Sequence, residues 1–129
     1  MIQESGLTLA YIGDAVYELK IREHLLSAGI TKVANLHKEA ITKYTSAQAQ
    51  SKIINYLMDK LTEEEIEYFK RGRNTGGTHH PKNSSLKDYR LATGFESLIG
   101  ALYLEKNEKR LSEIIELSIN FSNQEKPQI

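Results

Sequence analysis

Two carboxylates stand inside segments that are otherwise apolar or small. Asp14 lies in AYIGDAVYE (residues 10–18), and Glu96 lies in ATGFESLIGALYL (residues 92–104). Burying a carboxylate is unfavourable unless a partner compensates its charge. A divalent cation held between two helices would compensate both acids, and Mg²⁺ suits phosphodiester hydrolysis because it binds phosphate and activates water. The alternative is that each acid pairs with a basic residue from elsewhere in the chain.

The residues around the two acids are small, which is typical of helices that pack closely or of a backbone that a substrate must approach. They are Gly13, Ala15, Gly94 and Ser97. Glu18 lies one helical turn beyond Asp14, and Arg22 lies one turn beyond Glu18. Glu18 is therefore either an ion-pair partner of Arg22 or a supporting residue of the same site.

A basic segment lies between the two acidic ones. Residues 71–85 are rich in Gly, Asn, Thr and His, which predicts a loop, and a loop of this length in a small domain is usually functional. Lys and Arg side chains contact nucleic-acid phosphates, although the alternative is a solvated loop with incidental charge. The adjacent His79 and His80 are poorly spaced for zinc. The candidate RNA-binding residues are Lys70, Arg71, Arg73, His79, His80, Lys82, Lys87 and Arg90.

Composition limits the class of protein. The chain has 129 residues and a formal net charge of zero, so the basic segment is a local asymmetry. It has no cysteine, which excludes disulfides and thiolate metal sites. No run is apolar enough to span a membrane, and the N-terminus is unlike a signal peptide, so we expect a cytoplasmic protein. We expect one domain over residues 1–122, with a long basic loop at about 71–85, and a flexible C-terminal tail over residues 123–129.

Apolar residues recur at helical spacing nearly throughout and no stretch alternates like a strand, so the predicted fold class is all-α. The first helix is expected to end at Gly29. Its buried stripe is expected to comprise Ile12, Ala15, Val16, Leu19 and Leu26. Capping residues predict further helices that begin near residue 31, at residue 45 or 46, and near residues 62 and 107, and a long helix is expected over residues 86–105.

Together the two acidic segments resemble the paired signatures of the ribonuclease III catalytic domain. Residues 12–16 resemble the core of the first signature and residues 92–104 resemble the second, and the likeness extends over residues 7–117. The chain departs from the common pattern at Ala10 and Thr93, where that family has further acids. We expect no double-stranded RNA-binding domain after the catalytic domain, so the resemblance is to the short Mini-ribonuclease III subfamily.

The resemblance implies a helical bundle like the ribonuclease III catalytic domain, a homodimer, and Mg²⁺-dependent cleavage of double-stranded RNA that leaves 5′-phosphate ends. Mn²⁺ is implied as a substitute for Mg²⁺. Asp14 and Glu96 would bind the metal and carry catalysis, with Glu18, Arg22 and Thr93 as supporting residues. The two missing acids leave the number of metal ions open.

The short subfamily is associated with maturing the ends of 23S ribosomal RNA precursors, so precursor ribosomal RNA is the implied substrate. A ribosomal protein or the assembling large subunit is left open as a further partner. The alternative function is that of a catalytically inactive ribonuclease III-like protein that binds RNA in ribosome assembly. The presence of both Asp14 and Glu96 favours the enzyme.

Overall fold

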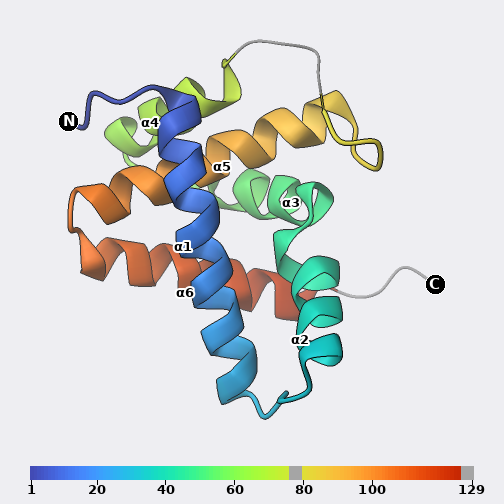
Figure 1. The fold of residues 1–129 in the computed structure, drawn as a ribbon. Helices are drawn as coiled ribbons and strands as arrows, with labels where there is room; N and C mark the ends of the chain where they lie inside the picture. The colour runs from blue at the N-terminus through green and yellow to red at the C-terminus, as the bar shows by residue number, and fades with distance from the viewer. Residues whose placement is uncertain (76–79, 126–129) are drawn as a thin grey trace.

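The computed structural model describes residues 1–75 and 80–125, and in that part the chain consists of helices and connecting turns. The all-α prediction is confirmed (Figure 1). The α-helices are α1 (Gly6–Ser27), α2 (Val33–Ala40), α3 (Ala47–Leu57), α4 (Glu63–Arg73), α5 (Leu86–Leu104) and α6 (Glu108–Gln124). A π-helical turn, η1 (Ile41–Thr45), joins α2 to α3, and a 3₁₀ turn, η2 (Met58–Lys60), follows α3. None of the described helices has the length and hydropathy needed to cross a membrane.

Side-chain caps begin three helices at residues that the sequence indicated. The Ser46 hydroxyl accepts a hydrogen bond from the Ala49 N–H at the start of α3. Thr62 and Glu65 form a reciprocal capping box on α4, and Asn107 caps α6. These bonds satisfy N–H groups that the first turn of a helix otherwise leaves without a partner.

Helix α5 forms the centre of the molecule. It packs against α1, α3, α4 and α6, and α1 crosses in front of it in Figure 1. From Ala92 to Leu102 its residues are buried, except that Glu96 is less fully covered. Large apolar side chains from several helices build the core around it, among them Tyr17, Ile54, Phe69, Phe95 and Ile114. The central helix therefore carries one of the two candidate acids.

The backbones of α1 and α5 touch where the two helices cross. A Cβ atom on Gly13 would collide with the carbonyl oxygen of Glu96, and one on Gly100 would collide with the carbonyl oxygen of Leu9. Glycine permits this approach because it has no side chain between the two backbones. The crossing therefore brings Asp14, the residue after Gly13, close to the turn of α5 that carries Glu96.

The apolar stripe predicted for α1 is wrong at Ala15, Leu19 and Leu26, whereas Val16 does pack against the core. Leu19 and Leu26 are 58% and 57% exposed and Ala15 is exposed, while Ile12 and Val16 are half-buried. The buried face of the helix instead comprises Gly6, Leu9, Ala10, Gly13, Tyr17, Ile21 and Leu25. Apolar residues lie on nearly all sides of α1, so their spacing could not distinguish the face that packs on α5 from the face that stays outside.

The basic loop begins later than predicted. Helix α4 continues to Arg73, so residues 71–73 are helical. Arg71 helps to hold this last turn, because its guanidinium donates hydrogen bonds to the carbonyls of Ile2 (2.7 Å) and Glu4 (3.1 Å) in the N-terminal segment. This contact joins segments far apart in the sequence, and local composition could not indicate it.

The start of the predicted flexible tail is also helical. Helix α6 extends to Gln124, and the side chain of Asn123 accepts a hydrogen bond from the Tyr44 hydroxyl. This long-range bond ties the end of α6 to η1. Residues 126–129 of the predicted tail lie outside the described part of the chain.

Candidate active site

An open pocket of about 390 Å³ lies between α1, the start of α3 and the first half of α5. Asp14 and Glu96, which the sequence predicted to share a site, both line it. The other lining residues include Ala10, Tyr11, Thr45, Gln50, Tyr89 and Thr93. We call this hollow the acid pocket. It brings together side chains from three helices that are distant in the sequence.

The two acids differ in burial. Asp14 is exposed, contrary to the expectation from its apolar neighbours, and Glu96 is mostly covered. The pKa of Glu96 is raised from its ordinary value to about 8, first by burial and then by the negative charge of Asp14, with which it shares a hydrogen bond. The amide of Gln50 opposes the rise in pKa by donating a hydrogen bond to the Glu96 carboxylate (3.3 Å). Without a cation, Glu96 therefore keeps its proton at neutral pH and does not add a second negative charge beside Asp14.

The donor set of the acid pocket fits a divalent cation of the magnesium type. None of the ion pairs formed among residues 1–75 and 80–125 includes Asp14 or Glu96. In the same part of the chain, no group of three or more His, Cys, Asp or Glu side chains could hold a metal ion. Two carboxylates are nevertheless enough for Mg²⁺, which usually takes one or two and completes its shell with water and substrate phosphate.

Two positions in the acid pocket carry neutral residues where the family pattern has acids. Ala10 and Thr93 both line the pocket and are 6% and 7% exposed. The Thr93 hydroxyl donates a hydrogen bond to the Tyr89 carbonyl one turn earlier (2.9 Å). The lining residues of the described pocket therefore offer two carboxylates, Asp14 and Glu96.

Of the predicted supporting residues, Thr93 lines the acid pocket and the other two do not. Glu18 forms an ion pair with Arg22 at 3.5 Å, and both line a separate hollow between α1 and α2. The charge of Glu18 still contributes to raising the pKa of Glu96. The contact of Glu18 is therefore an ordinary ion pair along the helix, and its effect on the acid pocket is electrostatic.

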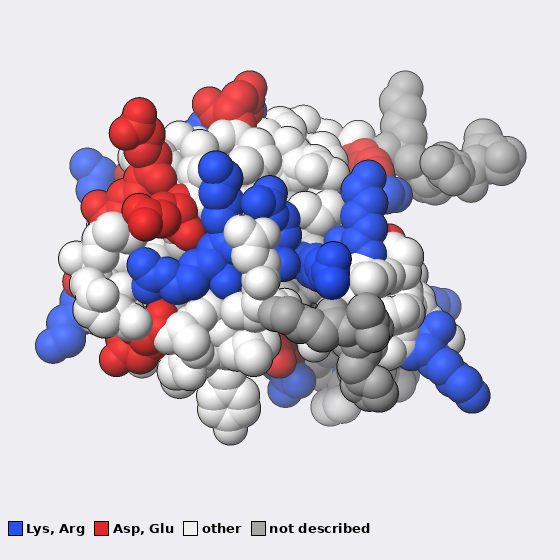
Figure 2. All heavy atoms as spheres, turned by 90° about the horizontal axis from the view of Figure 1, so that it is seen from above, with Lys and Arg blue, Asp and Glu red and all other residues white. Residues whose placement is uncertain are grey.

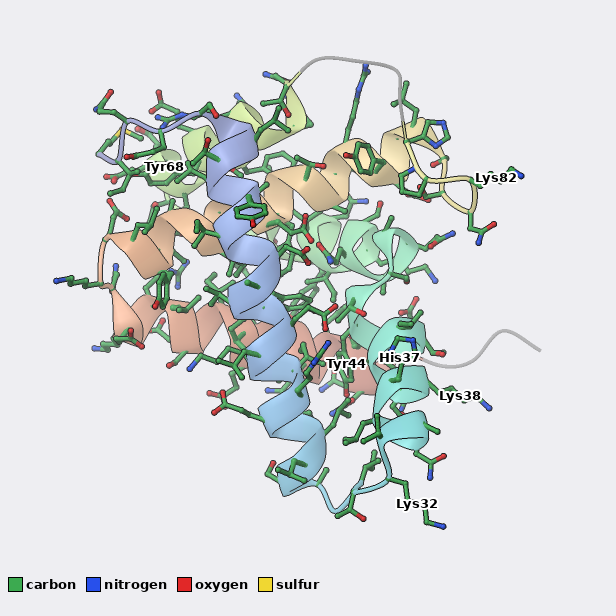
Figure 3. All side chains as sticks on the ribbon, viewed as in Figure 1. Lys32, His37, Lys38, Tyr44, Tyr68 and Lys82 are labelled. Carbon is green, nitrogen blue, oxygen red and sulfur yellow. The ribbon has the colours of Figure 1, made fainter. Side chains whose placement is uncertain are left out.

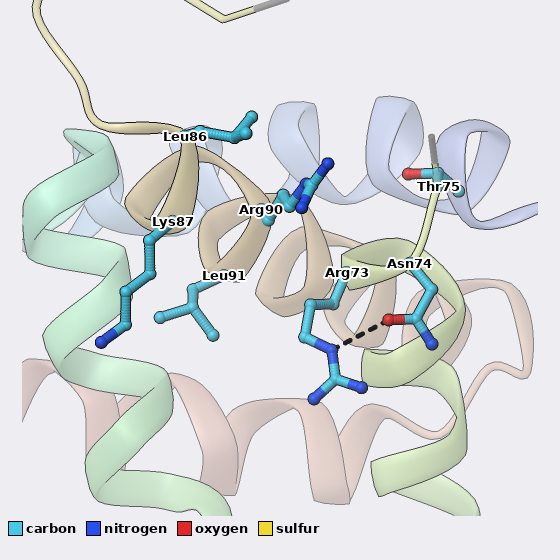
Figure 4. Close-up of a pocket in the computed structure, with 7 residues that line it drawn as sticks. All are labelled: Arg73, Asn74, Thr75, Leu86, Lys87, Arg90 and Leu91. Carbon is cyan, nitrogen blue, oxygen red and sulfur yellow. Dashed lines mark hydrogen bonds between the residues drawn. The ribbon is translucent and has the colours of Figure 1, made fainter. Parts of the chain in front are cut away.

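A second open pocket, of about 630 Å³, gathers three of the predicted RNA-binding residues (Figure 4). Arg73 reaches it from the end of α4, and Lys87 and Arg90 reach it from the first turns of α5. The Arg73 guanidinium donates a hydrogen bond to the Asn74 side chain (3.0 Å). Figure 2 shows Lys and Arg side chains gathered in the middle of the face seen from above. We call this hollow the basic pocket.

The remaining predicted RNA-binding residues are spread more widely. Lys70 is exposed on α4, and Lys82 points away from the helices (Figure 3). His80 is half-buried in the segment before α5. Arg71 is engaged by the carbonyls of the N-terminal segment, and His79 lies outside the described residues.

Sequence reasoning missed Gln50, which lines the acid pocket and contacts Glu96. The side chain is 3% exposed and shares the buried stripe of α3 with Ile53, Ile54 and Leu57. A glutamine within an otherwise apolar stripe at helical spacing is the signal that could have identified it, because such a polar group is seldom buried without a partner.

Comparisons with known proteins point to one family. Residues 7–107 match the family described as the ribonuclease III domain. The chain is 51% identical to a Mini-ribonuclease 3 of Clostridium tetani, over 92% of this chain and 78% of that protein. It is 45% identical to a Mini-ribonuclease 3 of Symbiobacterium thermophilum, over 89% of this chain and 88% of that protein. A crystal structure of a Fusobacterium nucleatum protein matches the fold with a TM-score of 0.81 at 36% identity, covering 92% of this chain and 93% of the other.

The fold and the matched domain define a ribonuclease III-type endoribonuclease, a class of enzyme that acts on double-stranded RNA and depends on divalent metal ions. Within that class the chain belongs to the Mini-ribonuclease 3 family. The family predicted from the two acidic segments is thereby confirmed. The fold confirms the predicted ribonuclease III-like bundle as well.

The acid pocket predicts an uncommon pH dependence of stability. Because the pKa of folded Glu96 is about 8, the folded protein keeps a proton that the unfolded chain releases above about pH 4–5. Raising the pH from about 5 to about 9 should therefore lower the free energy of unfolding in metal-free buffer. Glu96→Gln removes this titration and should be more stable than the wild type at about pH 9, by roughly 1–3 kcal/mol. Urea unfolding with a chelator at both pH values measures this, and identical pH profiles of the two proteins would contradict it.

Proposed function

We propose that this endoribonuclease is magnesium-dependent and that Asp14 and Glu96 hold the metal ion and carry catalysis. One observation carries the proposal: two carboxylates from distant segments line one open pocket, and neither forms an ion pair within the described residues. The raised pKa of Glu96 supports it, since a cation would let both carboxylates stay ionised at neutral pH. We propose Mn²⁺ as a substitute, because carboxylate and water ligands suit both ions.

A cation bound by these two acids would act as a Lewis acid on the scissile phosphodiester and lower the pKa of a bound water. Asp14 and Glu96 serve as ligands from two helices, and the close approach at Gly13 sets their separation. Ala10 and Thr93 bring no charge for a second ion, so we propose one metal ion per acid pocket, with a substrate phosphate completing its shell. The proposed cut leaves a 5′-phosphate and a 3′-hydroxyl.

The basic pocket is proposed to bind the RNA backbone beside the cleavage site. Tyr89 lines the acid pocket and Arg90 lines the basic pocket, so the first half of α5 contributes to both hollows from different faces of the helix. Arg90 and Glu96 stand on one helix, about 9 Å apart along its axis. Proteins recognise duplex RNA mostly through its phosphates and 2′-hydroxyls, which suits a pocket lined by Arg73, Lys87 and Arg90.

Removing basic side chains from this pocket should weaken the binding of an RNA duplex. For Arg73→Ala combined with Lys87→Ala, we expect the slope of log K against log salt to fall by roughly one unit for each phosphate that the variant no longer neutralises. Fluorescence anisotropy at several salt concentrations measures the slope.

Arg71→Ala is the matched control and should leave the slope unchanged. It should lower the free energy of unfolding by about 1–2 kcal/mol, because Arg71 binds backbone carbonyls. If the double variant keeps the wild-type slope, the RNA binds elsewhere.

Two copies of the chain are proposed to associate through the exposed side of α1. Four large apolar side chains of α1 have 57% to 80% of their surface exposed: Leu7 and Tyr11, which lie at the acid pocket, and Leu19 and Leu26 further along the helix. An uncovered apolar face is typical of a surface that binds another protein, and the resemblance to the ribonuclease III family supports a second copy as that partner. Sedimentation equilibrium at micromolar concentration should show a dimer. A monomer at every concentration would contradict this part of the proposal.

The proposed natural substrate is the double-stranded end of a 23S ribosomal RNA precursor in the cytoplasm, with the assembling large subunit or one of its proteins as a further partner. The likeness to Mini-ribonuclease 3 relatives supports this choice. The test compares a precursor stem with an unrelated duplex of equal length, each with and without Mg²⁺. We expect Mg²⁺-dependent cutting at a defined position in the precursor stem. Salt-sensitive binding of both duplexes without cutting would instead favour an inactive RNA-binding protein.

A further inference from the structure

Gln50 is a buried polar side chain in the wall of the acid pocket, outside the proposed set of metal ligands. It is 3% exposed and lies on α3. Its amide nitrogen donates two hydrogen bonds, one to the Thr45 carbonyl (3.0 Å) and one to Oε2 of Glu96 (3.3 Å). The Thr45 carbonyl can only accept a hydrogen bond, so the amide must face it with its nitrogen, because the flipped orientation would set oxygen against oxygen.

The oxygen of the Gln50 amide is not satisfied in the same way as its nitrogen. Its Oε1 is buried and finds no hydrogen-bond partner among the described residues. A buried acceptor without a partner destabilises a fold, and an apolar side chain of the same shape can be neutral or stabilising in its place. Packing alone therefore does not account for a glutamine at this position, and the bond to Glu96 points to a role in the site.

The Thr45 carbonyl belongs to η1, the π-helical turn that leads into α3. Short π-helical turns are rare in proteins, and those that occur are often found at functional sites. Two side chains bond to carbonyls at the end of η1: the Tyr17 hydroxyl from α1 donates to the Tyr44 carbonyl (2.9 Å), and Gln50 donates to Thr45. Gln50 in addition bonds to Glu96. It therefore connects this turn to the acid pocket.

We propose that Gln50 is a positioning residue, which holds the Glu96 carboxylate in the orientation at which Glu96 and Asp14 bind one divalent cation. The inference rests on the proposed metal site. A hydrogen bond to one oxygen fixes the rotation of a carboxylate and leaves its other lone pairs for the metal. A neutral amide does so without the positive charge by which a Lys or Arg would compete with the cation.

The test measures the binding of Mn²⁺ to the full chain. The electron paramagnetic resonance signal of the free ion reports how much Mn²⁺ remains unbound. Gln50→Met keeps the length of the side chain and removes its N–H donors. It should weaken Mn²⁺ binding by about 10- to 100-fold, while the midpoint of urea unfolding stays equal or rises. Gln50→Asn keeps an amide but is too short to reach both partners, and it should weaken binding similarly. Wild-type affinity in either variant would overturn the proposal.

Two controls separate positioning from a purely structural role. Gln48→Met changes an exposed glutamine on the same helix and should leave Mn²⁺ binding unchanged. Tyr17→Phe removes the other side-chain bond to η1 without touching the Gln50–Glu96 contact. We expect wild-type Mn²⁺ affinity for this variant. If its affinity falls as far as that of Gln50→Met, then Gln50 acts only through the turn and the proposal is wrong.

Glu96→Gln distinguishes failure of this inference from failure of the metal site itself. It should abolish Mn²⁺ binding, because it removes one of the two proposed ligands. Unchanged binding in Glu96→Gln would refute the metal site, and the role of Gln50 with it. Abolished binding in Glu96→Gln together with wild-type binding in Gln50→Met would refute only the role of Gln50.

Discussion

Changing either acid of the acid pocket to its amide should abolish cleavage and leave the protein folded. For Asp14→Asn and Glu96→Gln we expect the rate of cutting of an RNA duplex to fall by about a thousandfold or more, because the Lewis-acid action of a bound metal supplies several kcal/mol. Neither change should unfold the chain, since Asp14 is exposed and Glu96→Gln removes a charge that burial disfavours. Single-turnover assays at saturating Mg²⁺ measure the rates.

The matched control for these variants is Glu23→Gln. Glu23 is an exposed carboxylate on the same helix as Asp14 and does not line the acid pocket, so its amide should cut RNA at the wild-type rate. Both acid-pocket variants should still bind duplex RNA with the wild-type salt dependence, because the basic pocket is unchanged. Metal-dependent cutting by Asp14→Asn near the wild-type rate would place the metal elsewhere.

Gly13→Ala should damage the fold and the site together. The added methyl group would meet the backbone carbonyl of Glu96, and neither group can move aside unless α1 and α5 separate. Overpacking in a core usually lowers the free energy of unfolding by about 1–3 kcal/mol. A clash with backbone is harder to relieve than one with a side chain, so we expect the free energy of unfolding to fall by about 3 kcal/mol or more. Cutting should be abolished as well, since Asp14 follows Gly13 directly. Urea unfolding and the duplex-cutting assay measure the two effects.

A second glycine of the chain gives the control for this prediction. Gly29, just beyond α1, has a φ of 94°, and a Cβ placed there would meet nothing within 4 Å. Asn tolerates the left-handed conformation, so Gly29→Asn should cost less than about 1 kcal/mol and keep full activity. If Gly13→Ala is as stable as Gly29→Asn, then close contact between the helices does not set the geometry of the site.

Local signals were sufficient to predict where α3, α4 and α6 begin, but the cap predicted near residue 31 is wrong, because α2 begins after Lys32 without a side-chain cap. The caps at Ser46, Thr62 and Asn107 depend on hydrogen bonds within one turn, and the stop at Gly29 depends on its own backbone conformation. Such features are readable from a few neighbouring residues. The family was readable in the same way, from two short segments, and the match over residues 7–107 confirms it.

The candidate site was only partly predictable from residue types. Asp14 and Glu96 stand out as carboxylates among apolar neighbours, and the structure does bring both into the acid pocket. Residue type could not distinguish the basic residues that line a pocket from those that stabilise the fold. Arg71 and Arg73 are equivalent by charge and spacing, yet Arg71 binds the carbonyls of the N-terminal segment and Arg73 lines the basic pocket.

The sequence by itself determined the helical class, the order of the helices, the family and the pair of acids, because each depends on neighbouring residues or on a short motif. The tertiary structure alone decided which face of α1 is buried, that η1 forms a π-helical turn, and that Gln50 meets Glu96. Those outcomes depend on contacts between distant segments. In a helix that is apolar on nearly all sides, periodicity does not indicate which face is buried. The close approach of the α1 and α5 backbones at Gly13 determines which face of α1 packs against α5.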